Sequence, residues 1–331
     1  MLLEISKTAF KESSKDSGSN LPEKYLSKVI EHPIFIESKS NENFIKFNSY
    51  IKLSKPYHGV DELYANPPSY DIYITGSDQV WNPLQPYLIE PYFLTFVRNK
   101  NARKISYAAS MGINQLYPKE KKLFKSWIEK YDAVSVREEE LKDYLQQFIN
   151  KDIIRVADPT FLVDKNIWKE LSIGTVPTFK YILLFELDNN NKLLSFTKRI
   201  SLQANIPLIV IGQNKVESID KTYITVKDAG PSEFLSYIKN AEMVITDSFH
   251  GTVFSIIMET KNFYSYISPD SIKGSRITDL LKTFKIETHL LNPDLKQSWS
   301  ELIYNKLNKS DIQTIYEHEQ KLSRNFLDKN L

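Results

Sequence analysis

The sequence of 331 residues contains no cysteine and only nine glycines. Without cysteine there can be no disulfide, no thiolate zinc site and no cysteine nucleophile, and the absence fits a reducing compartment. With so few glycines, a glycine in a predicted turn is informative, although α/β loops also need glycine for purely structural reasons. We expect four of them to mark binding turns, namely Gly76, Gly112, Gly251 and Gly274.

The sequence also lacks a strong excess of one charge and any long apolar run. The net charge is +2, so bulk electrostatics favour neither nucleic acid nor a membrane surface as a partner. No apolar run is long enough to span a bilayer, and residues 1–20 do not have the pattern of a signal peptide. We therefore expect a cytoplasmic protein with no integral membrane span. Its substrate could still bring it into peripheral contact with the inner face of the membrane.

The sequence also lacks the common motifs of metal-binding sites and of nucleotide-phosphate-binding loops. There is no HExxH motif, no DxD-type acidic pair at a strand end and no GxxxxGK[ST] loop. We expect a site without a metal ion, although scattered ligands would escape this search.

What the sequence does contain is an alternation of apolar strands and amphipathic helices. This alternation indicates βαβ units and parallel sheets, and the chain length indicates two domains. The predicted strands span residues 70–75, 104–109, 133–137, 153–157, 181–187, 207–212, 223–226, 243–246 and 262–267. The pattern pauses near Gly174 and Pro177, so we predict domains at residues 1–172 and 173–331. Residues 1–56 show no strand of the kind that opens a doubly wound sheet, which predicts an incomplete first sheet.

Residues 242–259 carry the most informative junction, because a short apolar strand, a polar turn and a helix follow one another. The turn holds Ser248, His250 and Gly251, and we expect the helix to begin near Thr252. Ligands of α/β proteins bind beyond the carboxyl ends of the strands, where a helix N-terminus favours anions. Histidine at such a place suits proton transfer. The alternative is an ordinary polar surface histidine.

A second strand-to-loop junction follows residues 70–75. Its polar side chains can bond several hydroxyl groups and belong to Ser77, Asp78, Gln79 and Asn82. Trp81 in the same loop could stack on a sugar ring, but a large aromatic residue is more often packed in a core, which we favour. The alternative for Asp78 is a carboxylate that caps the loop.

Two arginines stand where a strand ends or a helix begins. Arg137 directly follows an apolar strand and could hold a carboxylate or a phosphate. A salt bridge to the glutamates that follow it is equally compatible with its position. Arg276 opens a later helix.

Six short segments of the sequence, in the order of the chain, resemble motifs of the polysaccharide pyruvyl transferase family. They are Gly76–Pro83 (GSDQVWNP), Ile105–Gly112 (ISYAASMG), Ser135–Glu138 (SVRE), Ala157–Thr160 (ADPT), Thr246–Gly251 (TDSFHG) and Ser275–Ile277 (SRI). The resemblance covers about residues 71–281. Some members have Arg-Leu where this chain has Ser248-Phe249 before the histidine.

The resemblance implies two Rossmann-like α/β domains that face each other across a cleft, as in GT-B glycosyltransferases. It implies transfer of a pyruvyl group from phosphoenolpyruvate to two hydroxyls of a sugar in a surface-polysaccharide precursor, which forms a cyclic ketal. No cofactor is expected beyond phosphoenolpyruvate as the donor substrate, and the acceptor would be a sugar or a lipid-linked oligosaccharide.

The resemblance also assigns roles to residues of the two predicted domains. His250 would be the general acid of the donor site, and Asp78 our candidate for the base. The remaining donor contacts would come from Arg137, Arg276, Ser248 and Gly251, and the acceptor contacts from Gly76, Ser77, Gln79, Trp81 and Asn82. Two alternatives stay open, a GT-B-like glycosyltransferase that uses a nucleotide sugar and a non-catalytic glycan-binding relic of the family.

Overall fold

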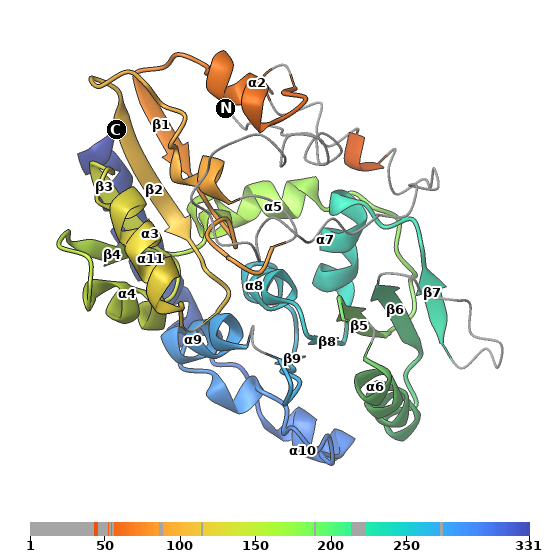
Figure 1. Cartoon of the computed structure of the whole chain (residues 1–331). Coiled ribbons are helices and arrows are strands. Elements are labelled where there is room, and N and C mark those ends of the chain that lie inside the picture. Colours follow the sequence, from red (N-terminus) through yellow and green to blue (C-terminus); the bar gives the residue numbers. More distant parts are fainter. Residues whose placement is uncertain are drawn as a thin grey trace. The chain divides into compact units, whose positions relative to one another are not determined.

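The computed structural model describes residues 43–45, 52, 54, 56–85, 89–113, 115–188, 190–212, 223–271 and 274–331. Most of the segment in which no opening strand was predicted, residues 1–56, lies outside these ranges. Among the described residues the chain forms two compact units, shown in Figure 1. Unit 1 comprises residues 52–159 and 322–331, and unit 2 comprises residues 43–45 and 160–321.

The boundary therefore lies between Pro159 and Thr160, earlier than the predicted boundary after Ser172. The reason is the packing of helix α5 (Lys165–Leu171). Its Trp168 donates a hydrogen bond from Nε1 to the carbonyl of Thr160 (2.9 Å) and packs edge-on against Phe254 of unit 2, with ring centroids 5.1 Å apart. These contacts attach the segment after Pro159 to unit 2.

Unit 1 is built on a parallel sheet of four described strands in the order β1-β2-β3-β4. Their bounds are β1 Ile72–Thr75, β2 Arg103–Ala109, β3 Ala133–Val136 and β4 Ile153–Arg155. Helices α2 (Val60–Ala65), α3 (Pro118–Ile128) and α4 (Glu139–Gln146) contribute side chains to one core with the sheet. The 3₁₀ helix η4 (Glu90–Phe93) adds Phe93 to this core.

The chain returns to unit 1 at its end. Helix α11 runs from Lys309 to Asn330, and its last residues belong to unit 1. Ser323 accepts a hydrogen bond from the main-chain N–H of Ala157 (2.9 Å), and Phe326 lies 6.4 Å from the Tyr107 ring. The Tyr107 hydroxyl donates to the carbonyl of Ala157 (3.0 Å), so both main-chain polar groups of Ala157 are hydrogen-bonded.

Unit 2 contains a parallel sheet of five described strands in the order β7-β6-β5-β8-β9. The strands are β5 Ile182–Glu186, β6 Leu208–Gly212, β7 Ile224–Val226, β8 Met243–Thr246 and β9 Phe263–Ser265. This is the doubly wound order, in which the direction of winding reverses between β5 and β8. Ligands of such sheets bind beyond the carboxyl ends of the strands at that reversal.

Helices accompany the strands of unit 2. Besides α5, they include α6 Asn191–Ala204, α7 Pro231–Asn240, α8 Phe249–Ile257, α9 Ser275–Thr283, η6 Glu287–His289 and α10 Trp299–Tyr304, while η5 Pro159–Leu162 spans the boundary. Phe196 of α6 and Leu302 of α10 share a core with Ile182 and Leu184 of β5. Phe185 points to the opposite face, where its ring lies 4.7 Å from Phe234 of α7. Because successive strand residues point to opposite faces, helices cover both faces of β5.

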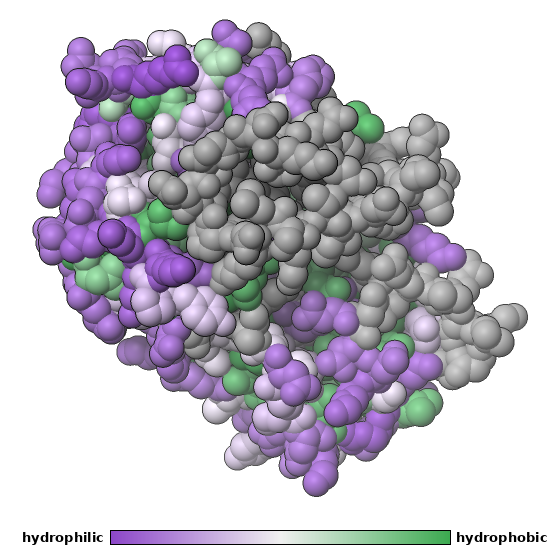
Figure 2. Space-filling view, viewed as in Figure 1, coloured by the Kyte–Doolittle hydropathy of each residue, from purple (hydrophilic) through white to green (hydrophobic). Residues whose placement is uncertain are grey.

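On the face shown in Figure 2 hydrophobic residues form small separate spots among hydrophilic ones. No helix within the described ranges combines the length and the apolar character that crossing a bilayer requires.

Candidate active site

The loop after β1 presents Asp78 at the carboxyl end of the unit 1 sheet. The main chain of Asp78 is fixed, because its carbonyl accepts hydrogen bonds from Val80 N (2.8 Å) and Ser110 N (2.9 Å). Its φ of 67° lies in the left-handed region, which is uncommon outside glycine and typical of functional or strained turns. The Asp78 side chain remains 53% exposed, so its carboxylate is open to solvent at this edge.

Gly76 and Ser77 attach this loop to strand β2. Gly76 has a φ of 118°, and a Cβ there would lie 1.9 Å from the Tyr107 carbonyl oxygen, so only glycine fits. The Ser77 hydroxyl is 3.0 Å from the carbonyl of Ala108 and 3.2 Å from Asp158 Oδ2. Both residues were predicted to contact the acceptor, and in the structure their contacts shape the loop that carries Asp78.

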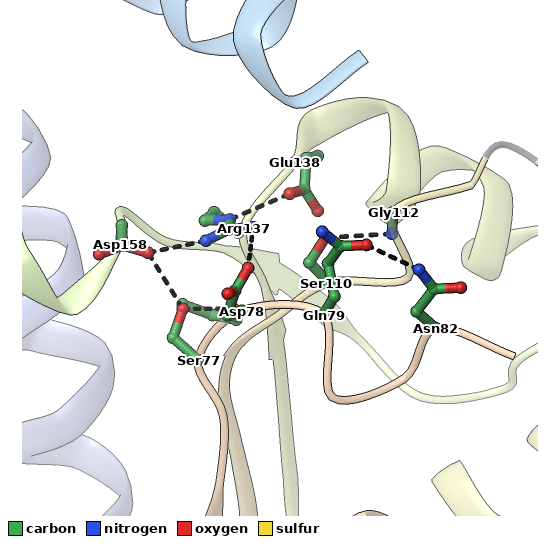
Figure 3. A network of polar contacts seen from close by, with 10 residues as sticks. Ser77, Asp78, Gln79, Asn82, Ser110, Gly112, Arg137, Glu138 and Asp158 are labelled. Atoms are coloured by element: carbon green, nitrogen blue, oxygen red, sulfur yellow. Dashed lines mark hydrogen bonds and ion pairs between the residues drawn. The ribbon is translucent and has the colours of Figure 1, made fainter. Parts of the chain in front are cut away.

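Arg137 lies next to Asp78, with a side chain that is only 3% exposed (Figure 3). Each nitrogen of its guanidinium meets a carboxylate. Nε pairs with Glu138 (3.0 Å), Nη1 with Asp158 (2.8 Å) and Nη2 with Asp78 (3.1 Å). Burial alone would lower the pKa of the guanidinium, but Glu138, Asp158 and Asp78 raise it above its ordinary value.

This environment argues against the predicted role of Arg137 in donor binding. A phosphate or carboxylate would have to replace the carboxylates that already engage the guanidinium, and the side chain is almost fully buried. The salt-bridge alternative is the arrangement observed, with Asp78 and Asp158 added to the predicted partner Glu138. Through its three ion pairs, Arg137 therefore links the residues that follow β1, β3 and β4.

Gln79 and Asn82 form a second pair of polar side chains on the loop after β1. The Asn82 amide donates from Nδ2 to Gln79 Oε1 (2.6 Å), and Asn82 Oδ1 accepts from the Leu84 main chain (2.9 Å). Asn82 is buried and shapes the loop, whereas Gln79 is half-buried. Figure 3 shows this pair next to Ser110 and Gly112, on the same edge as Asp78.

Trp81 is fully buried, so of the two alternatives for this residue the core position is the observed one. Its ring stacks on Phe93 with centroids 5.0 Å apart and an interplanar angle of 7°, and meets Tyr131 edge-on at 5.9 Å. A ring enclosed in this way offers no face to a sugar, which corrects the predicted acceptor contact. Trp81 instead anchors the loop in the core of unit 1.

In unit 2, His250 lies in the first turn of α8, directly after β8. The helix begins at Phe249, three residues before the predicted start at Thr252, because Ser248 acts as its N-cap. The Ser248 hydroxyl accepts from Gly251 N (3.3 Å), and Ser248 N donates to Thr246 Oγ1 (3.0 Å). The capped turn fixes the position of the imidazole at the carboxyl end of β8.

Gly251 allows α8 to approach β8 closely. A Cβ at this position would lie 2.4 Å from Thr246 Oγ1 and 3.0 Å from Phe185 Cδ1. Since Gly251 is buried, its observed contribution is packing. The structure shows that Ser248 caps α8 and that Gly251 allows close packing. The predicted contacts of both residues with the donor stay predictions.

Arg276, at the start of α9, lies near the turn that carries His250. Its guanidinium carbon is 5.8 Å from the centroid of the Phe249 ring, and that ring meets the His250 ring edge-on at 5.3 Å. Arg276 and His250 thus both lie next to the Phe249 ring. Arg276, rather than Arg137, is the predicted arginine that accompanies the histidine.

Asp247 is a residue of this turn to which sequence reasoning gave no role. Its carboxylate accepts from the main-chain N–H groups of Leu187 (2.8 Å) and Asp188 (3.2 Å), which follow β5. Asp247 therefore ties together the ends of β5 and β8, where the strand order reverses. Burial raises the pKa of its carboxyl group, although the two backbone hydrogen bonds act in the opposite direction. Its place directly after an apolar strand was the available signal.

The predicted residues thus form two groups, one in each unit. Asp78, Ser77, Gln79, Asn82 and Arg137 share the strand ends of unit 1, and Ser248, His250, Gly251 and Arg276 share those of unit 2. Within the described ranges no three acidic or histidine side chains are grouped as metal ligands would be, and the expectation that no cofactor is needed stays a prediction.

Comparisons with known proteins identify both family and fold. The family model for "Polysaccharide pyruvyl transferase" matches residues 13–269, which reaches further toward the N-terminus than the recognised motifs and ends before Arg276. The comparison with curated proteins found no match.

Among solved structures, UDP-N-acetylglucosamine 2-epimerase from Rickettsia bellii aligns with a TM-score of 0.51 and 10% identity, covering 86% of this chain and 84% of that chain. The enzyme of the same name from Methanocaldococcus jannaschii, in complex with UDP-GlcNAc and UDP, aligns with a TM-score of 0.47 and 13% identity, covering 84% and 80%. The predicted fold, α/β with two Rossmann-like units of the GT-B type, is confirmed. The predicted cleft between the units stays a prediction.

Proposed function

The chain belongs to the polysaccharide pyruvyl transferase family, and from that premise we propose that it transfers a pyruvyl group from phosphoenolpyruvate to two hydroxyls of a sugar. The product would be a cyclic ketal on a surface-polysaccharide precursor, with inorganic phosphate as the leaving group. The acceptor sugar would be free or part of a lipid-linked oligosaccharide.

The observation that carries this proposal is the turn between β8 and α8. It places His250 in the first turn of a helix, at the strand-order reversal of a doubly wound sheet, with the Arg276 guanidinium beside the Phe249 ring. A cation and a helix N-terminus favour an anionic ligand there, and histidine is the side chain most often used for proton transfer. Phosphoenolpyruvate carries a phosphate and a carboxylate and needs a proton at its methylene carbon.

The reaction can be written with these groups. His250 gives a proton to the methylene carbon, which becomes a methyl group, and positive charge develops at the neighbouring carbon. A sugar hydroxyl adds at that carbon and loses its proton to a base, for which Asp78 is the candidate. The carbon–oxygen bond to phosphate then breaks, and the second hydroxyl closes the ring as its proton leaves with the phosphate. Arg276 would stabilise the departing charge.

The exposed carboxylate of Asp78 supports the assignment of the acceptor to unit 1. It stands on a loop that also carries the half-buried Gln79, whose carboxamide can bond hydroxyl groups, and the ion pair with Arg137 keeps it at the strand end. With Arg137 engaged by three carboxylates, this unit offers little attraction to a dianionic donor. The donor therefore fits unit 2 better, and the sugar fits unit 1.

A thermal-shift titration with phosphoenolpyruvate tests the donor half of the proposal. A ligand that binds only the native state stabilises it by about 2.7 kcal/mol at one hundred times its dissociation constant. We expect a shift in the wild type that is lost in His250→Ala and Arg276→Ala. His318→Ala is the matched control, because His318 is an exposed histidine on α11, and it should keep the full shift.

The product completes the test. Release of inorganic phosphate from phosphoenolpyruvate in the presence of a sugar would identify the transfer, and mass spectrometry would detect the ketal on the sugar. If millimolar phosphoenolpyruvate leaves the unfolding temperature unchanged while a nucleotide sugar raises it, the proposal is wrong and the glycosyltransferase alternative takes its place.

A further inference from the structure

Gly112 lies just beyond the end of β2, in a motif that the proposed reaction does not use. Its φ of 65° favours glycine, and its position is crowded. A Cβ on Gly112 would lie 2.1 Å from Gln79 Oε1 and 2.7 Å from Gln79 Cδ. The carboxamide of Gln79 therefore occupies the space that the side chain of any other residue would need.

The orientation of that carboxamide follows from its neighbours. The main-chain N–H of Leu84 can only donate, so the Asn82 atom that faces it is the oxygen. Asn82 Nδ2 then faces Gln79, and the Gln79 atom that receives this hydrogen bond must be Oε1. The Gln79 amide nitrogen consequently points away from Asn82.

The segment around Gly112 cannot easily move aside. Ser110 donates its N–H to the carbonyl of Asp78 (2.9 Å), and the Ser110 carbonyl accepts from Trp81 N (3.1 Å). Gly112 N in turn donates to Ser110 Oγ (3.3 Å). A Cβ at Gly112 must therefore displace either the Gln79 carboxamide or the main chain that positions Asp78.

We infer that Gly112 is a positioning residue for the sugar acceptor, acting through the Gln79 carboxamide. The missing side chain at Gly112 keeps an oriented amide next to the exposed carboxylate of Asp78, so the loop offers an amide and a carboxylate to neighbouring sugar hydroxyls. This inference rests on the proposed function, because it concerns the acceptor side of the same reaction. It requires that a larger residue at Gly112 weaken acceptor binding and leave donor binding unchanged.

The test compares Gly112→Ala, Gln79→Ala and the double variant. Phosphate release from phosphoenolpyruvate is measured with methyl glycosides of mannose, glucose and galactose as acceptor probes. Gly112→Ala is expected to raise the acceptor KM about tenfold, the effect of losing one hydrogen bond, with an unchanged KM for phosphoenolpyruvate. Gln79→Ala should do the same, and the double variant should show no further loss.

Gly174→Ala is the matched control for a glycine replacement that only disturbs packing. Its Cβ would lie 2.6 Å from Glu233 Cα in unit 2, so stability should fall with no change in the acceptor KM. An unchanged acceptor KM in Gly112→Ala overturns the inference. So does a double variant in which the two losses multiply, because independent effects would mean that Gly112 does not act through Gln79.

The proposed function and this inference can fail separately. If the wild type releases no phosphate from phosphoenolpyruvate, the proposed function fails, and saturation-transfer NMR with the same methyl glycosides decides the inference. Binding by the wild type that Gly112→Ala loses upholds it. Equal binding by both proteins, or none by the wild type, overturns it.

Discussion

Replacement of Arg137 by methionine separates the structural role observed for this residue from the donor-binding role predicted from sequence. The side chain is 3% exposed and pairs with Glu138 and Asp158, which are 5% and 1% exposed, and with the more open Asp78. Methionine has a similar length but carries no charge, so the buried carboxylates lose this cation. Breaking a buried ion pair from one side costs about 3–5 kcal/mol of folding free energy. We expect Arg137→Met to lower the stability of unit 1 by that amount.

The assay should report on unit 1 alone, since the two units need not unfold together. The chain has four tryptophans, of which Trp81 and Trp127 belong to the core of unit 1 and the others lie in unit 2. Urea unfolding followed by fluorescence, in a background where Trp168 and Trp299 are replaced by phenylalanine, therefore monitors the right unit. Phosphoenolpyruvate binding is measured separately on folded protein.

Arg137→Lys is the matched variant, because it keeps the charge. A compact ammonium on a flexible chain cannot meet three carboxylates as the planar guanidinium does, so we expect an intermediate loss of stability. The reasoning is refuted if Arg137→Met unfolds within about 1 kcal/mol of the wild type and has lost phosphoenolpyruvate binding. That result would restore the donor-binding role.

Three further predictions concern unit 2. His289 is buried beside Tyr264, and burial lowers its pKa from 6.5 to about 4, so the unfolded chain binds a proton more readily than the folded one. Stability is then highest above pH 6.5 and falls by about 3 kcal/mol as the pH drops toward 4, and His289→Phe should remove this part of the pH dependence of urea unfolding. Gly251→Ala places a Cβ 2.4 Å from Thr246 Oγ1 and should cost about 1–3 kcal/mol in thermal unfolding; an unchanged midpoint would mean that α8 does not pack as closely as described. Asp247→Asn leaves one acceptor for the N–H groups of Leu187 and Asp188 and should cost about 1–3 kcal/mol, so a variant as stable as the wild type would contradict the link between β5 and β8.

Three strands of the unit 2 sheet could be predicted from sequence because they are nearly continuous apolar runs bounded by polar turns. Residues 182–186, 208–212 and 243–246 have this form, and each falls within or matches a predicted strand. Parallel strands buried on both faces produce such runs, so composition alone locates them. The domain boundary was less predictable, because α5 follows unit 1 in sequence and packs with unit 2 through Trp168.

Helix starts depend on capping, which the sequence shows only indirectly. The predicted start of α8 at Thr252 followed from treating the whole polar stretch as a turn. Ser248 is a favourable N-cap residue, and its bond to Gly251 N moves the start of the helix to Phe249. As a result His250 belongs to the first helical turn, where its position is fixed by the helix rather than by a loop.

Arg137 and Arg276 show where sequence reasoning stops. Both stand where a strand ends or a helix begins, and both were predicted to attract the donor. Their environments differ because neighbouring strands supply different residues. The ends of β1 and β4 place Asp78 and Asp158 against Arg137, whereas the first turn of α8 places the Phe249 ring near Arg276. Which carboxylates reach an arginine depends on strand order and register, and these are properties of the sheet rather than of any one segment. An arginine at a strand end is therefore a candidate for anion binding only after its neighbours across the sheet are known.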